Sequence, residues 1–182
     1  ATGAVTRYDA IDSKRMMLLQ GGNTLRMVDW TTKTATAAAS NSGNGTDYAQ
    51  TGQITSSGRI GAYARADGSL VAVGVGSASI AFGGETVSAT TGFSSISAVA
   101  PLHTGVIALG TASSGGGPLL RTFSFANASF FGLSRFYPNL TINLGNSGIT
   151  QPVDVATVVA PEPGSIAVLG LGAIVLLRRR RR

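Results

Sequence analysis

The sequence predicts an all-β domain followed by a single C-terminal transmembrane helix. Only 12% of the 182 residues are charged, and glycine, serine, threonine and alanine are abundant, a composition that favours sheet over helix. Short apolar runs recur along the chain, bounded by glycine and polar residues. The C-terminus combines an uncharged apolar run with five consecutive arginines, which is the pattern of a membrane segment with a basic flank.

Charge and cysteine content exclude several classes of function. The net charge of +6 arises mainly from the five terminal arginines, because residues 1–160 contain nine Lys/Arg against seven Asp/Glu. No basic cluster stands in that part of the chain, so nucleic-acid binding is not expected. The chain has no cysteine, which excludes disulfides, thiolate metal sites and a cysteine nucleophile.

Three apolar runs, each followed through glycines by a second run, indicate a repeated β unit. The first members are residues 16–19, 70–73 and 106–109, and the second members are residues 25–30, 78–82 and 119–125. The first members begin 54 and then 36 residues apart. The longer gap contains the polar segment 40–47, which we predict to be a loop.

A repeat of about 40 residues with three or four short strands per unit is typical of β-propeller blades. The unit from Tyr8 to Thr36, with a strand ending in Asp29-Trp30, resembles a blade of a WD-repeat propeller. We therefore expect residues 1–150 to form a partial propeller, with a β-sandwich as the alternative. Because propellers have about four to eight blades, we also expect this domain to be incomplete at its N-terminus.

The remaining elements follow from local signals. Asp67-Gly68 is a good hairpin turn between the strands predicted at 60–66 and 70–75. Residues 93–99 and 103–109 form a similar strand pair around Pro101. A short strand at 139–144 precedes a turn at 146–148, and residues 151–160 are predicted to be a linker.

The apolar run from Gly164 to Leu177 has 14 residues and no charge. As a helix it would be about 21 Å long, against roughly 30 Å for the hydrocarbon core of a bilayer. Arginine side chains extend the apolar reach of such a helix by snorkelling. We therefore predict a transmembrane helix at 164–177, with Arg178–Arg182 as a stop-transfer cluster on the cytoplasmic side.

Pro161-Glu162-Pro163, followed by this apolar run and the arginine cluster, resembles the PEP-CTERM sorting signal of Gram-negative bacteria. The resemblance covers residues 161–182. It implies recognition by an exosortase, a membrane-embedded processing enzyme, with processing near the tripeptide. It also implies delivery to the cell surface or extracellular matrix, in proteins commonly associated with exopolysaccharide and biofilm formation.

No residue pattern predicts catalysis, and we expect no catalytic, cofactor-binding or metal-binding residues and no cofactor. His103 is the only histidine, and it is expected to be a turn residue. The acidic residues are scattered, whereas a glycosidase needs two carboxylates across one cleft. Asn41, Asn44 and Asp47 carry oxygens of the kind that Ca²⁺ prefers, but their spacing is not that of an EF-hand loop, and the sequence leaves calcium binding at 41–47 open.

The leading hypothesis is a non-enzymatic protein, exported and sorted through the C-terminal signal. Its expected partners are the membrane, an exosortase-type enzyme and, as a candidate ligand, exopolysaccharide. Its expected location is the cytoplasmic membrane, as a single-pass protein with a cytoplasmic C-terminus, and then the cell surface or matrix. The alternative hypothesis is the anchored C-terminal part of an exported enzyme whose catalytic residues lie upstream.

Overall fold

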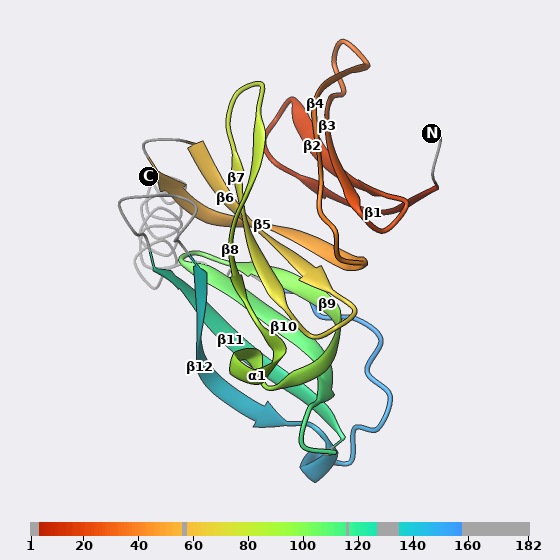
Figure 1. Ribbon diagram of the computed structural model, residues 1–182, viewed down its shortest axis with the longest axis vertical. Coiled ribbons are helices and arrows are strands. Elements are labelled where there is room, and N and C mark those ends of the chain that lie inside the picture. Colours follow the sequence, from red (N-terminus) through yellow and green to blue (C-terminus); the bar gives the residue numbers. More distant parts are fainter. Residues whose placement is uncertain (1–3, 56–57, 116, 127–134, 158–182) are drawn as a thin grey trace, which may run out of the picture.

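The computed structural model describes residues 4–55, 58–115, 117–126 and 135–157. In these residues the chain forms three four-stranded antiparallel sheets, and within each sheet every strand pairs with the next one along the chain (Figure 1). We call the three sheets blades 1, 2 and 3. Such a meander needs only short connections, because antiparallel neighbours can be joined by tight turns.

The strand boundaries define each blade. Blade 1 contains β1 (Val5–Ala10), β2 (Arg15–Gln20), β3 (Thr24–Asp29) and β4 (Thr34–Ser40). Blade 2 contains β5 (Gly45–Thr55), β6 (Gly58–Arg65), β7 (Leu70–Val75) and β8 (Ile80–Thr86). Blade 3 contains β9 (Phe93–Leu102), β10 (Gly105–Ala112), β11 (Pro118–Ala126) and β12 (Arg135–Asn143). Two single turns of helix, α1 (Ser88–Thr91) and η2 (Gly145–Ser147), complete the described elements.

Blade 2 lies between the other two blades and is buried on both faces. One face packs on blade 1 through a shared apolar cluster: Met17, Leu19, Leu25 and Met27 of blade 1 with Tyr48, Tyr63, Val71, Val73 and Val75 of blade 2. The opposite face packs on blade 3 through a second cluster: Ile60, Ala62, Ala64, Leu70 and Ala72 of blade 2 with Phe93, Ile96, Val106, Phe123 and Phe136 of blade 3. Burial of both faces explains why β7 is an unbroken apolar run.

The first strand of each blade lies on the same side of the assembly. Strand β5 contacts both β1 and β9, whereas the fourth strands contact one another from β4 to β8 and from β8 to β12. We therefore call β1, β5 and β9 the inner strands. This arrangement, with four-stranded meanders side by side and their first strands together, agrees with the predicted blades (Figure 1).

The hairpin predicted at Asp67-Gly68 is confirmed. Gly68 has a φ of 81°, the left-handed conformation that favours glycine, and the Asp67 carboxylate accepts a hydrogen bond from the backbone N–H of Ser69 at 2.9 Å. A Cβ atom at Gly68 would collide with the carbonyl oxygen of Phe93, so this turn also fits closely against blade 3.

The predicted alignment of the repeat is wrong for blade 2. The apolar run at 70–73 was matched to the second strand of blade 1, but it forms β7, the third strand of its own blade. The true counterpart is β6, because β2, β6 and β10 begin 43 and 47 residues apart. Tyr63 and Arg65 made β6 look less apolar than β7, although Tyr63 is fully buried.

Two predicted boundaries also change. The polar segment 40–47 is a loop only at its centre, since Ser40 ends β4 and residues 45–47 begin β5. The strand predicted at 139–144 is β12, which starts earlier, at Arg135, and the turn predicted at 146–148 overlaps η2. At 40–47 polar strand residues were mistaken for a loop, because outward-facing strand residues need not be apolar.

The predicted fold class combined an all-β domain with a C-terminal transmembrane helix, and the helix is not supported by the structure. No helix in the described ranges is long and apolar enough to span a membrane. The longest described helix, α1, has four residues and rises only about 6 Å, far short of a bilayer core. The fold that the structure describes is therefore all-β, and the transmembrane helix predicted at 164–177 lies outside the described residues.

Candidate functional site

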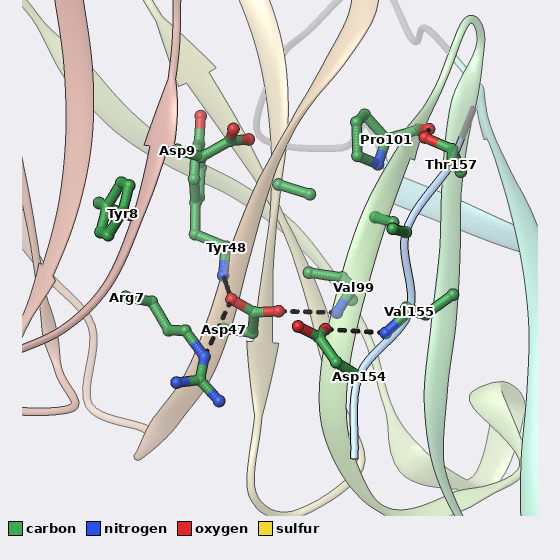
Figure 2. Close-up of a pocket in the computed structure, with 13 residues that line it drawn as sticks. Arg7, Tyr8, Asp9, Asp47, Tyr48, Val99, Pro101, Asp154, Val155 and Thr157 are labelled. Atoms are coloured by element: carbon green, nitrogen blue, oxygen red, sulfur yellow. Dashed lines mark hydrogen bonds and ion pairs between the residues drawn. The ribbon is translucent and has the colours of Figure 1, made fainter. Parts of the chain in front are cut away.

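A groove runs along the inner strands, on the side where the three blades meet. It consists of two cavities of about 310 and 440 Å³ that share Pro101 and Thr157 in their walls. The first is lined by Arg7, Tyr8 and Asp9 of β1, Asp47, Tyr48 and Ala49 of β5, Val99, Ala100 and Pro101 of β9, and residues 154–157 (Figure 2). The second adds Ala10, Ile11, Gln50, Thr51, Gly52, Arg59, Leu102 and His103. We call the whole feature the inner-strand groove.

Asp47 joins the inner strands of blades 2 and 3. One carboxylate oxygen accepts the backbone N–H of Tyr48 at 2.9 Å, and the other accepts the backbone N–H of Val99 at 2.8 Å. The Arg7 guanidinium lies 3.7 Å from the first oxygen (Figure 2). Burial raises the pKa of Asp47, and the nearby Asp154 carboxylate adds to the rise, although the hydrogen bonds and Arg7 oppose it.

Asp9 plays the same part between blades 1 and 2. Its carboxylate accepts a hydrogen bond from the backbone N–H of Gln50 at 2.6 Å. A side chain from β1 therefore provides the hydrogen-bond partner of this β5 backbone N–H. Burial raises the pKa of Asp9, although this hydrogen bond opposes the rise. Each of these two inner strands therefore caps a backbone N–H of the next inner strand with an aspartate, which spares that donor the cost of being buried without a partner.

Blade 3 departs from this pattern. Asp47 stands three residues before Gln50, the residue whose backbone N–H is capped from blade 1. The position three residues before Val99, the corresponding capped residue of blade 3, is Ile96, which is fully buried in the core. Hydrogen bonds from aspartates to backbone N–H groups thus link blade 1 to blade 2 and blade 2 to blade 3. Strand β9 has no aspartate at the matching position.

Two tyrosines of the groove differ sharply in environment. Tyr48 is buried, and its hydroxyl donates to the Gln50 side-chain oxygen at 2.7 Å. Burial raises the pKa of Tyr48 well above its usual value, so the phenol stays neutral at ordinary pH. Tyr8, in contrast, is 77% exposed beside Arg7 and offers an aromatic face to solvent.

The segment after η2 forms the fourth wall of the groove. The Thr157 hydroxyl donates to the carbonyl oxygen of Pro101 at 2.7 Å, and the Asp154 carboxylate accepts the backbone N–H of Val155 at 2.7 Å. Val155 is half-buried in this position. Part of the predicted linker 151–160 is therefore packed along the inner strands.

Two of the residues considered as calcium ligands in the sequence, Asn41 and Asp47, direct their side-chain oxygens to backbone N–H groups. Asn41 accepts the backbone N–H of Gly43 at 3.0 Å, while both oxygens of Asp47 are used within the groove. Among the described residues, no three or more His, Cys, Asp or Glu side chains are placed to share a metal ion. His103 lies in the turn between β9 and β10, as predicted. The sorting residues Pro161, Glu162 and Pro163 and the arginines Arg178, Arg179, Arg180, Arg181 and Arg182 lie outside the described residues.

Lowering the pH from neutral toward 3.8 is expected to increase the stability that Asp9 and Asp47 contribute. Their pKa is raised in the folded state, so the folded chain binds these protons before the unfolded chain does, and the gain levels off below 3.8, where the unfolded carboxyls are protonated too. Urea unfolding at several pH values checks this against Asp47→Asn. As the pH falls, the free energy of unfolding of the wild type should rise relative to that of the variant. If the free energies of both proteins change with pH in parallel, the assignment is contradicted.

The fold belongs to the β-propeller class. The structure superposes on the β-propeller domain of Cps50 (Swd1) from Myceliophteria thermophila with a TM-score of 0.52 and 13% identity, over 78% of this chain and 44% of that chain. The N-terminal domain of Nup159 matches with a TM-score of 0.43 and 14% identity, over 75% of this chain and 37% of that chain. The chain thus spans less than half the length of these two solved chains. The predicted propeller-like blades are confirmed.

The C-terminus carries a PEP-CTERM protein-sorting motif, which matches residues 159–182. This confirms the predicted resemblance and places the motif two residues beyond the groove wall that ends at Thr157. The motif implies an exported protein that is processed by an exosortase-type enzyme and is secreted, surface-located or membrane-associated. No curated protein matches the chain in sequence.

Proposed function

We propose that this chain is a non-enzymatic binding module, exported through its sorting motif and displayed at the cell surface or in the extracellular matrix. The observation that carries the proposal is the sorting motif at 159–182 directly behind a propeller-like domain that presents a groove. On this proposal the motif supplies the location and the groove supplies the ligand site.

The groove favours binding over catalysis. A carboxylate that acts as general acid, base or nucleophile must reach the substrate. Asp9 and Asp47 instead direct oxygens to backbone N–H groups of the neighbouring inner strands. Tyr48 is also engaged, since its hydroxyl donates to Gln50. These groups have a structural use, which supports a groove that recognises a ligand without transforming it.

The chemistry at the mouth of the groove suits a saccharide. Tyr8 presents an exposed aromatic face, against which the apolar C–H face of a sugar ring can stack. Arg7 and Asp154 stand beside it in the same cavity, and both are charged groups that can hydrogen-bond ring hydroxyls. We therefore propose exopolysaccharide of the producing cell as the ligand, and a role in its matrix or biofilm.

Tyr8→Ala is expected to weaken binding of the full chain to exopolysaccharide isolated from the producing cells about tenfold, the order expected when one stacking contact is lost. Co-sedimentation or surface plasmon resonance measures the effect. Tyr137→Ala is the matched control, because Tyr137 is also an exposed tyrosine but lies on β12, outside the groove-lining residues. Equal affinity of the Tyr8 and Tyr137 variants, or no binding by the wild type, would refute the groove as the polysaccharide site.

A further inference from the structure

The segment that leads into the sorting motif is docked on the folded domain. Asp154, Val155 and Thr157 line the inner-strand groove, and only three residues separate Thr157 from Pro161, the first residue of the tripeptide (Figure 2). Upstream, the backbone N–H of Ile149 donates to the carbonyl oxygen of Leu144 at 3.1 Å, which marks the start of the segment. We call residues 150–157 the latch.

The docking of the latch determines how far the tripeptide can extend from the domain. A chain extends at most about 3.3–3.6 Å per residue. With Thr157 held in the groove, Pro161 can therefore lie no more than roughly 14 Å from it. If the latch were released back to Ile149, the same proline could lie roughly 43 Å from that residue. Docking thus limits how far the sequence to be processed can extend from the groove.

Most contacts that hold the latch are at least partly exposed. Residues 150–152 line a cavity of about 370 Å³ beside blade 3, and residues 154–157 line the inner-strand groove. The side-chain hydrogen bond from Thr157 to Pro101 is exposed, and Val155 is only half-buried. The Asp154 carboxylate lies near Asp47, whose charge repels it. A backbone segment held by few buried contacts opens at a lower free-energy cost than the strands of a blade.

We propose that the latch gates processing: while it is docked along the inner strands the tripeptide at 161–163 is held back from the processing enzyme, and release of the latch exposes it. This inference rests on the processing implied by the sorting motif and not on the identity of any ligand.

Two substitutions shift the latch in opposite directions. Thr157→Val keeps the shape of the side chain and removes the hydroxyl, so amide hydrogen exchange across residues 150–157 of the full chain should become about fivefold faster, the value of one net hydrogen bond. Asp154→Asn removes the repulsion from Asp47 and should slow exchange. Val153→Thr is the matched control, since Val153 belongs to the same segment but is 82% exposed and lines neither the inner-strand groove nor the cavity beside residues 150–152.

If the latch gates processing, variants with faster amide hydrogen exchange in the latch should also be processed faster. In cells that carry the export machinery, pulse-chase labelling should show faster maturation of Thr157→Val and slower maturation of Asp154→Asn, with the control like wild type. If exchange is altered but the maturation rates are equal, the latch contacts are confirmed and the proposal that the latch gates processing is refuted. Unaltered exchange in both variants would show that these contacts do not hold the latch and would also overturn it. A wild type that never matures would refute processing itself.

Discussion

A chain in which Pro161, Glu162 and Pro163 are all replaced by alanine is expected to accumulate as the full-length precursor, with essentially no mature form. The two prolines restrict the tripeptide to extended backbone conformations, and a processing enzyme binds its substrate in such a conformation. Alanine removes this restriction and the only charge of the tripeptide. Intact mass spectrometry of protein isolated from the producing cells measures the ratio of precursor to mature form.

The control for this experiment is Pro152→Ala. It changes a proline upstream in the latch and leaves the tripeptide unaltered, so its maturation should be complete. Normal maturation of the triple variant would contradict the assignment of 161–163 as the processing site. Failure of the Pro152 variant to mature would show that the enzyme reads the upstream segment as well.

Phe123→Ala is expected to reduce the free energy of unfolding by about 3–5 kcal/mol, the largest stability loss that we predict. Phe123 is 1% exposed and lies in the core between blades 2 and 3, with its ring centroid 6.3 Å from that of Phe93. Its removal leaves a cavity in a core shared by two blades, so both should lose stability together. Urea unfolding, combined with hydrogen exchange resolved along the chain, measures this.

The matched control is Tyr137→Ala, which removes an aromatic side chain that is 47% exposed on the same blade. Its expected effect is within about 0.5 kcal/mol, as for most surface substitutions. A loss for Phe123→Ala no larger than that of the control would contradict the shared core. A loss confined to blade 3 in the exchange data would show that the blades unfold independently.

The sequence allowed the blades to be predicted wherever the local signal was strong. The apolar run at 16–19 and the turn at Asp67-Gly68 correspond to β2 and to the hairpin between β6 and β7. The alignment failed at β6, where Tyr63 is buried between blades and its hydroxyl proton is shared between the carbonyl oxygens of Gly22 and Gly43, at 3.0 and 2.9 Å. Whether a polar atom on a strand finds such partners depends on loops far away in the sequence.

The groove could not be predicted, because its walls come from four distant stretches of chain. Asp9 and Asp47 were taken as scattered acidic residues, yet the fold places each beside a backbone N–H of the next inner strand. One signal was available. Asp9 and Asp47 each lie inside a β-strand, and a carboxylate that becomes buried there is costly unless it has a partner, so it indicates contact with a neighbouring sheet.

The route of the chain after β12 has a mechanical consequence. If the C-terminus is fixed and the protein is pulled by flowing liquid, tension acts first on Thr157 and its exposed contact with Pro101. Release of the latch would free eight residues, at most roughly 29 Å of extended chain, before the load reached the ladder between β12 and β11. The latch would therefore detach at a lower force than any strand of a blade, and its extension would delay unfolding of the blades.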